Sequence, residues 1–467
     1  MGMNAVQLRS CCLVGLTSVL LVLCGCQGLQ SPATPNANLQ SINHIIFMAQ
    51  ENRSFDTYFG QLPAYWSANG YPSVQFDGIP ANASNPSYDG KTSVPAFHLA
   101  TECIQNLSPS WNESHEDWNR KDPTSSTATM DGFIFNAASY ALNAPPDEAP
   151  IYDTLGIRAM GYYDGSDLNY YYFMASNFAT SDRWFSPALD RTQVNRMYLI
   201  AATSQGYAYP PGTNTADTLP LTAPTIFDAL QKAGISWKIY ATDFGSSGSD
   251  PATYLTMFAP YAPPNQLPAN VVPATQFLTD AANGTLPQVA MIEGGYNSGL
   301  DEHPKNNVQT GAAYAASLIN GLMNSQSWKD SVFILTYDEA GGLYDHVPPQ
   351  PAVNPDGIAP VDLNSGDICS TPGGANCDFN YTGFRVPLLV VSPFSKMQFV
   401  SHTVADYTAI LKFIETRFNI PSLTKRDAAQ MDMTEFFDFQ NTPWATPPTP
   451  PVQATGGTCD YQKLQAQ

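Results

Sequence analysis

Charge is scarce in this sequence, and positive charge is scarcest. Charged residues make up 13% of the 467 residues, with 20 Lys and Arg against 40 Asp and Glu, and there are six His. The formal net charge of −20 repels phosphate backbones and anionic bilayers, so we expect no nucleic-acid partner. An anionic substrate is still compatible with this charge, because a bound cation can dominate the field inside one cleft.

The sequence also lacks an apolar run long enough to favour a membrane-spanning helix. The run from Cys11 to Cys24 follows Arg9 and gives way to polar residues, which is typical of a signal peptide. Leu23-Cys24-Gly25-Cys26 resembles the lipobox of bacterial lipoproteins, in which Cys26 would carry the lipid; a plain secretory signal is the alternative. We therefore expect an exported protein, either anchored to a membrane surface through Cys26 or released into the periplasm or the extracellular space.

No CxxC pair occurs in the sequence, which disfavours a zinc site built from cysteines. After the signal, four cysteines remain, and an exported protein can pair them in disulfides. Cys369 and Cys377 bracket a turn-rich loop and are the preferred pair, which leaves Cys103 for Cys459. The other two connectivities stay open.

Apolar runs alternate with helical patterns along the chain, most clearly in its second half. This alternation predicts an α/β fold with a mostly parallel sheet covered by helices on both faces. We expect strands at 42–47, 183–185, 237–240, 288–292, 332–337 and 386–391, and helices at 168–178, 192–199, 226–232, 311–323 and 407–418. The expected parts of the chain are a signal peptide (1–25), a polar tether (26–40), one large domain (41–430) and a Pro-rich tail (431–467).

Carboxylates and amides stand where two of the expected strands end. Glu51 and Asn52 follow the first strand, and Asp338 and Glu339 follow the strand at 332–337. In an open α/β sheet, ligands bind outside the carboxyl ends of the strands. Oxygen ligands of this kind suit a divalent cation without selecting one metal. The pattern therefore favours a site for one divalent metal ion, against the alternatives of a capped helix start and a solvated loop.

Two histidines and one threonine could serve the same site. His303 and His346 stand in acidic, Gly- and Pro-rich loops after strands, and imidazole titrates near neutral pH. Thr192 opens a predicted helix, whose N-terminal amides and dipole favour an incoming phosphate. The alternatives are structural histidines and a plain N-cap. A metal ion at the strand ends could lower the pKa of a bound Thr192 hydroxyl and stabilise charge on a transferring phosphoryl group.

Six motifs occur in order between residues 42 and 430. They are Glu51-Asn52-Arg53-Ser54-Phe55-Asp56, Met160-Gly161-Tyr162-Tyr163, Thr192-Gln193-Val194-Asn195-Arg196, Glu302-His303-Pro304, Tyr337-Asp338-Glu339 with Gly342-Leu343-Tyr344-Asp345-His346-Val347-Pro348, and Phe384-Arg385-Val386-Pro387 with Ser392-Pro393. Together they resemble the bacterial phosphoesterase family, which holds haemolytic and non-haemolytic phospholipases C, plant non-specific phospholipases C and a group of acid phosphatases.

The resemblance implies an alkaline-phosphatase-like, three-layer α/β/α sandwich and a hydroxyl nucleophile that forms a phospho-enzyme. Carried over by position, Thr192 would be the nucleophile, and His303 and His346 would bind phosphate or protonate the leaving group. The metal ligands would be Glu51, Asn52, Asp338 and Glu339, and the expected substrate-binding residues are Asn195, Arg196, His115 and Asp345. Of these, Asn195 and Arg196 complete the nucleophile motif, and the resemblance favours a supporting role for them over direct contact with the substrate.

Two positions depart from the family pattern. Val194 stands where the nucleophile motif usually has proline, and Pro109 stands where a histidine commonly precedes the Ser110-Trp111 pair. The first interpretation is a phospholipase C acting on phospholipid diesters. A phosphomonoesterase of the acid phosphatase type is the close alternative, because one scaffold serves both. A non-catalytic surface-binding lipoprotein is the third.

Overall fold

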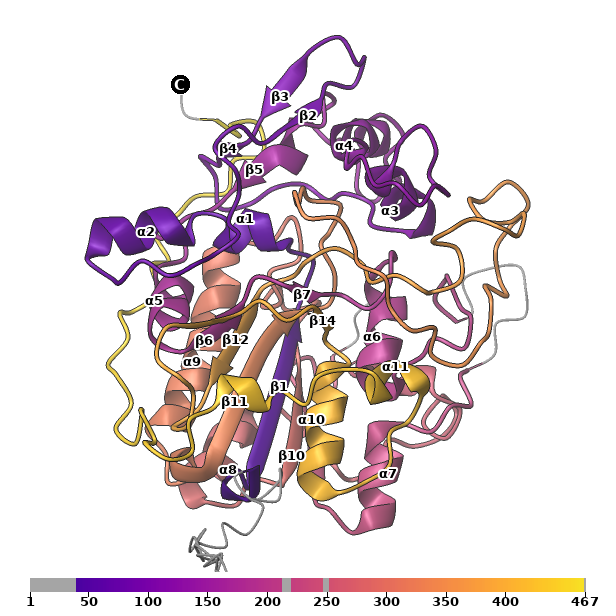
Figure 1. Ribbon diagram of the computed structural model, residues 1–467. Coiled ribbons are helices and arrows are strands. Elements are labelled where there is room, and N and C mark those ends of the chain that lie inside the picture. Colours follow the sequence, from indigo (N-terminus) through magenta and orange to yellow (C-terminus); the bar gives the residue numbers. More distant parts are fainter. Residues whose placement is uncertain (1–38, 212–219, 247–251, 466–467) are drawn as a thin grey trace, which may run out of the picture.

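The computed structural model describes residues 39–211, 220–246 and 252–465 (Figure 1). The expected signal peptide, with Cys26, and all but the last two residues of the tether lie outside these ranges. Of the tether, Leu39 and Gln40 belong to a short 3-10 turn, η1 (Leu39–Ser41), in which Leu39 is buried. Within the described ranges, no helix combines the length and the apolar character that crossing a bilayer requires.

An eight-stranded sheet forms the centre of the molecule, and only one of its strands runs against the others. In sheet order the strands are β13 (Phe399–Ser401), β6 (Ala179–Ser181), β12 (Leu388–Val391), β11 (Ser331–Tyr337), β1 (His44–Gln50), β10 (Val289–Glu293), β8 (Trp237–Ala241) and β9 (Val271–Pro273). β12 is antiparallel to both of its neighbours, and every other pair is parallel. This confirms the mostly parallel sheet that the sequence predicts.

β1 lies between β11 and β10 in the middle of the sheet, and its composition explains its place. Its residues His44 to Gln50 are apolar and β-branched for most of their length, and all but His44 are buried. A strand that is buried on both faces reads as a continuous apolar run rather than an alternating one. The register joins Met48 to Ile292 on one side and to Leu335 on the other, so that the ends of three strands meet at one edge.

Helices cover the sheet in two groups, as Figure 1 shows. α5 (Asn169–Asn177) and α8 (Thr275–Asn283) contact α9 (Val308–Met323), and this group lies on one side of the sheet. The other side holds α6 (Thr192–Ala201), α7 (Ile226–Ala233), α10 (Ala409–Phe418) and α11 (Lys425–Ala428). The two groups and the sheet form the expected three layers. Each of the predicted helices is present, with ends shifted by three residues or fewer.

The segment between β1 and α5, whose elements the sequence pattern does not define, forms an irregular cap. It holds α1 (Phe55–Phe59), α2 (Leu62–Asn69), α3 (Trp111–Trp118), α4 (Phe133–Leu142), η2 (Ile157–Met160) and the short strands β2 (Ser84–Pro86), β3 (Ser93–Pro95), β4 (Phe97–His98) and β5 (Gly161–Tyr162). Figure 1 shows these elements gathered over the end of the sheet at which β1 ends. The remaining elements are β7 (Trp184–Phe185), β14 (Ala405–Asp406), η3 (Tyr254–Met257), η4 (Trp328–Asp330) and η5 (Thr434–Phe436).

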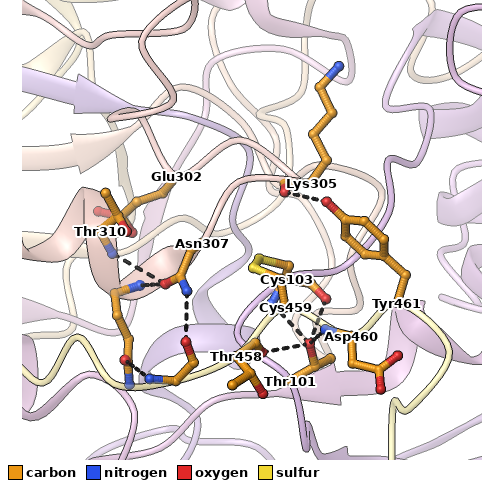
Figure 2. The surroundings of a disulfide bond; sticks show 12 residues. Thr101, Cys103, Glu302, Lys305, Asn307, Thr310, Thr458, Cys459, Asp460 and Tyr461 are labelled. Atoms are coloured by element: carbon orange, nitrogen blue, oxygen red, sulfur yellow. Dashed lines mark hydrogen bonds between the residues drawn. A yellow bond between two sulfur atoms is a disulfide. The ribbon is translucent and has the colours of Figure 1, made fainter.

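The Pro-rich tail is irregular after η5, yet it packs against the domain. Both preferred disulfides are formed, Cys369–Cys377 and Cys103–Cys459. Around the second one, the Glu102 amide donates to the Thr458 carbonyl at 3.1 Å. The Asp460 amide donates to the Thr101 hydroxyl at 2.8 Å (Figure 2). The tail therefore packs over the segment of the chain that leads into α3.

Candidate active site

Four of the predicted site residues line one cavity of about 390 Å³, although they are far apart in the sequence. Glu51 and Asn52 follow β1, His303 follows β10, and Thr192 begins α6. They meet because the parallel strands β1 and β10 end at the same edge of the sheet. The cap completes the cavity with Asn106, Ser108, Pro109, Tyr140 and Glu148.

Asn52 connects the end of β1 to both the predicted nucleophile and the predicted metal ligands. Its backbone is left-handed, with φ of 58°, a conformation that Asn adopts more readily than most residues. Its amide donates to Asp338 Oδ1 at 3.2 Å, and its side-chain oxygen accepts the Thr192 hydroxyl at 3.2 Å. The turn at Asn52 therefore brings the ends of β1 and β11 to the start of α6.

Thr192 is the first residue of α6, and the capping position belongs to Arg191. The plain N-cap alternative for Thr192 is therefore wrong, since its hydroxyl bonds to Asn52. Asn195 fastens the same turn: its side chain accepts the Ala188 amide at 3.0 Å and donates to the Asp190 carbonyl at 2.6 Å. Asn195 is thus occupied with the backbone, and it does not line the cavity.

Arg196 is buried beside the cavity among three carboxylates. Its guanidinium lies 3.1 Å from Glu51, 3.4 Å from Asp338 and 3.6 Å from Glu293. Burial alone would lower the pKa of Arg196, but the carboxylates raise it above the ordinary value. Because these contacts occupy Arg196, the geometry gives it a supporting position rather than a contact with substrate.

Asp338 and Glu339 follow β11 and are fully buried. Burial raises the pKa of Asp338, opposed by Arg196, and burial together with Asp338 raises the pKa of Glu339. Asp338 Oδ2 and Glu339 Oε1 accept no hydrogen bond within the described ranges, and a buried oxygen of this kind is costly. Arg196 Nε, at 3.4 Å, compensates the charge of Asp338 Oδ2 in part, whereas Glu339 forms no ion pair within the same ranges. These oxygens are hard ligands of the kind that divalent cations accept, and Asn52 joins them to the end of β1. The carboxylates of Glu51, Asp338 and Glu339 do not, however, bring three ligand atoms within 4.8 Å of one another.

Among the described residues, two groups of acidic and histidine side chains do bring three ligand atoms within 4.8 Å of one another, and neither includes a predicted metal ligand. One consists of His98, Asp164 and Asp167, near the surface. The other consists of Asp56, Asp345 and His346. In this second group the buried Arg385 guanidinium already lies 3.0 Å from Asp56 and 2.9 Å from Asp345, and a further cation would be repelled.

His346 and Asp345 therefore lie in a charge cluster of their own, and neither lines the cavity. His346 contacts Asp56 at 2.7 Å and Asp77 at 3.1 Å. Burial lowers the pKa of His346, but its hydrogen bond to Asp56 raises it above the ordinary value overall. The turn formed by Gly341 and Gly342, both at positive φ, leads the chain away from Glu339. At Gly341 a Cβ would lie 2.6 Å from the Asn52 carbonyl, so only glycine fits.

His303 lines the cavity, and the neighbouring residue Glu302 anchors the loop that carries it. The Glu302 carboxylate accepts the hydroxyls of three tyrosines, Tyr58 at 2.7 Å, Tyr171 at 2.5 Å and Tyr337 at 2.8 Å. His303 Nδ1 lies 2.9 Å from the Pro304 carbonyl, so Nδ1 carries the proton in the neutral ring and Nε2 is the remaining acceptor. Burial lowers the pKa of His303 to about 4.

His115 is completely buried on α3, outside the cavity lining. Its ring nitrogens lie 2.7 Å from the Trp111 carbonyl and 3.4 Å from the Asn376 carbonyl, and burial lowers its pKa to about 4. The structure therefore places His115 away from the cavity wall to which Pro109 belongs. Pro109 itself lines the cavity, so the departure from the family pattern changes the cavity wall.

Several residues around the site carry no signal in the sequence. Tyr254, in η3, donates its hydroxyl to Glu51 at 2.9 Å, and Tyr140 and Tyr296 line the cavity. Arg191 also lines it, directly before Thr192. These contacts depend on how loops of the cap and of residues 252–300 fold over the sheet edge, and local patterns do not encode that.

Residues 42–421 match the model of the Phosphoesterase family. Phospholipase C B of Mycobacterium tuberculosis is 31% identical over 456 residues, covering 88% of this chain and 80% of the relative. Non-specific phospholipase C5 of Arabidopsis thaliana is 28% identical over 432 residues, covering 83% and 72%. A solved structure of a protein in the alkaline phosphatase superfamily from Vibrio parahaemolyticus aligns with 80% of this chain and 78% of its own, at a TM-score of 0.33 and 11% identity.

At the edge of the sheet, the hydroxyl of Thr192, the amide of Asn52 and the buried carboxylate of Glu51 line one cavity, while Asp338 and Glu339 are buried outside its lining. Together with the phospholipase C relatives and the family match, this defines an enzyme that hydrolyses phosphoric esters. The match extends over most of the chain and includes every motif of the site. The protein belongs to the Phosphoesterase family.

Proposed function

We propose that this protein is an exported, metal-dependent phospholipase C, which hydrolyses the phosphodiester bond of phospholipids with Thr192 as its nucleophile. One observation carries the proposal. The Thr192 hydroxyl lies 3.2 Å from Asn52 Oδ1 in a cavity that Glu51 and His303 also line, while two buried carboxylate oxygens without hydrogen-bond partners lie behind it. Relatives named phospholipase C support the choice of substrate.

The residues that would hold the metal ion are Glu51, Asn52, Asp338 and Glu339. A divalent ion bound there would lower the pKa of the Thr192 hydroxyl and offset the negative charge on the phosphoryl oxygens. Thr192 Oγ would attack phosphorus, the bond from phosphorus to the glycerol oxygen would break, and the diacylglycerol would leave. Water would then cleave the phosphothreonine ester and release the phosphorylated headgroup.

His303 would handle the proton of the leaving group. Its depressed pKa makes it neutral in the free enzyme at pH 7, with Nε2 as the acceptor. The negative charge of a bound phosphate would raise the pKa of His303, so that Nε2 would take up the proton that the Thr192 hydroxyl loses and pass it to the departing oxygen. Asn195 and Arg196 would support the Thr192 turn and the carboxylates. We assign no catalytic or substrate-binding role to His346, Asp345 or His115, because none of them lines the cavity.

A phosphomonoesterase is the second candidate, and Pro109 is the reason to keep it. This residue lines the cavity where the family commonly has a histidine, so the wall that meets the second substituent of a diester is altered. A paired assay decides between the two functions. Purified protein would be offered p-nitrophenyl phosphorylcholine and p-nitrophenyl phosphate, each with EDTA and then with a panel of divalent metals.

Preference for the diester supports the phospholipase C, and preference for the monoester makes the protein a phosphatase. Turnover that is unaffected by EDTA contradicts the metal assignment. No turnover of either substrate with any metal contradicts both functions and favours a surface-binding lipoprotein.

Export with a lipid anchor at Cys26 is part of the same proposal. Two disulfides support it, because such bonds persist in oxidising compartments outside the cytosol. Expression of the full chain and of Cys26→Ser, followed by separation of membranes from soluble material, tests the anchor. The anchored protein should be in the membrane fraction and the variant in the soluble fraction. The same distribution for both would contradict lipidation at Cys26.

A further inference from the structure

Arg191 is the only lysine or arginine among the described residues that line the cavity. It lies directly before Thr192 and is half-buried. Its Nε is buried without a hydrogen-bond partner in the described part of the chain, where its guanidinium also forms no ion pair within 4.0 Å. A buried, unsatisfied N–H of a charged group is costly, so a ligand that accepts from it would be stabilised.

Hydrogen bonds hold the backbone of Arg191 in place, but they do not hold its guanidinium. Its amide donates to Asp190 Oδ1 at 2.8 Å, and its carbonyl accepts from the Asn195 amide at 3.2 Å and from the Asn195 side chain at 3.3 Å. These bonds hold it at the N-terminus of α6, where the helix dipole already favours an anion. The side chain therefore begins next to the nucleophile and extends into the same cavity.

The charges around Arg191 differ from those around Arg196. Arg196 is within 3.6 Å of three carboxylates and so is already compensated. Besides Glu51, the acidic residues of the cavity wall are Asp147 and Glu148, and Glu148 lies 3.6 Å from Lys305. Arg191 forms no ion pair in the described part of the chain, so its guanidinium is the positive group of the cavity wall that an anion can meet beside Thr192.

We propose that Arg191 contacts the substrate and binds a non-bridging oxygen of the phosphoryl group opposite the metal ligands. This rests on the proposed function, because it assigns a residue to the same site. The planar guanidinium suits the task, since its N–H groups match the geometry of phosphate oxygens. Binding of a phosphate would also satisfy the buried Nε. Recognition of a phosphoryl group therefore becomes partly independent of the metal ion.

The experiment is a calorimetric titration of inorganic phosphate into the purified, metal-loaded full chain, with metal content measured in each sample. Wild type is compared with Arg191→Gln, Arg191→Lys and a control, Arg120→Gln. Arg120 is also partly buried and belongs to the cap, but it stacks on Phe135 at 3.8 Å and does not line the cavity. We expect the dissociation constant for phosphate to rise about 10- to 100-fold in Arg191→Gln, which loses charged hydrogen bonds. Arg191→Lys should lie between, and Arg120→Gln should match wild type.

A phosphate dissociation constant for Arg191→Gln within twofold of wild type, at equal metal content, would overturn the proposal. Loss of metal from this variant, with full phosphate affinity restored by excess metal, would overturn it too, because Arg191 would then act on the metal site. The lysine variant keeps the charge and provides the comparison should Arg191→Gln fail to fold. Turnover by Thr192→Ala would refute the proposed nucleophile and leave the phosphate-binding result intact, so the two failures are distinguishable.

Discussion

Removal of the Cys103–Cys459 disulfide should destabilise the protein and impair catalysis together. The perturbation is the double variant Cys103→Ser/Cys459→Ser, and Cys369→Ser/Cys377→Ser is the matched control. The first disulfide joins residues 356 positions apart, and the second joins residues eight positions apart. A cross-link restricts the unfolded chain more strongly when the loop that it closes is longer.

The magnitude follows from the two loop lengths. The chain-entropy relation gives a loss of about 6 kcal/mol for removal of the long-loop disulfide and about 2.5 kcal/mol for the short one. Native-state relaxation reduces both values, so the difference of about 3 kcal/mol between the two double variants is the quantity to test. Urea titration followed by tryptophan fluorescence measures the free energy of unfolding of each variant.

The catalytic effect comes from what the tail holds. Tyr461 donates its hydroxyl to the Lys305 carbonyl at 2.7 Å, and the Asn307 side chain donates to the Gly457 carbonyl at 3.2 Å (Figure 2). Lys305 is two residues after His303, so the tail braces the loop that carries this histidine. We expect kcat/KM of the Cys103/Cys459 variant to fall at temperatures where it is still folded, and that of the control to change less than twofold. Equal unfolding energies for the two variants, or unchanged kcat/KM in the first, would refute the reasoning.

Three further predictions concern the carboxylates and the histidines. Glu339→Gln should weaken the binding of whichever divalent metal supports turnover by more than about tenfold, since even residues that contact a metal only indirectly contribute that much to its affinity. Calorimetric titration of the metal into metal-free protein measures the affinity, and an unchanged value would exclude Glu339 as a ligand. His303 and His115 have pKa values of about 4 when folded and about 6.5 when unfolded, so at these two residues the unfolded chain binds more protons between about pH 4 and 6.5, and their contribution to stability is lost as pH falls. Buried carboxyls with raised pKa values, such as Asp345 at about 6 and Glu102 at about 7, act in the opposite direction, so the quantity to test is the difference between wild type and His115→Gln in a series of urea titrations. Removal of His115 should take away a slope of up to about 1.4 kcal/mol per pH unit in this window; the same slope in the variant would contradict this. Glu302→Gln should cost about 2–4 kcal/mol in the same titrations, because an amide cannot accept from Tyr58, Tyr171 and Tyr337 as a carboxylate does, whereas a loss below about 0.5 kcal/mol would show that the tyrosine bonds matter little.

Much of the fold is predictable from local pattern, and the exceptions are short elements. The β1 and β11 strands are nearly continuous apolar runs, which is the pattern of a strand that helices cover on both faces. β6, β9 and β13 have three residues each, too few to carry a periodic signal. The cap is not predictable from local pattern for another reason. Its helices are short, and its chain is held by contacts between distant residues, such as those of Arg158 with the Asn106 and Ala137 carbonyls.

The candidate site divides in the same way. Glu51, Asn52, Asp338 and Glu339 are predictable because parallel strands end at one edge, so residues just after them must be neighbours. His303 and Thr192 join them in the structure. His346 and Asp345 belong to the same motif as Asp338, yet the Gly341-Gly342 turn carries them to Arg385. Closeness in sequence to a strand end therefore no longer predicts that a residue lies in the site once a left-handed turn intervenes.

Turnover of p-nitrophenyl phosphorylcholine by Thr192→Ala, beside wild type and Thr192→Ser, tests most sharply whether Thr192 is the nucleophile. Unfolding in urea provides the check that the variants are folded. We expect Thr192→Ala to lose activity by more than about a thousandfold at unchanged stability, while Thr192→Ser keeps a measurable rate because its hydroxyl can form the same phosphoryl ester. Activity of Thr192→Ala within about tenfold of wild type would show that Thr192 is not the nucleophile.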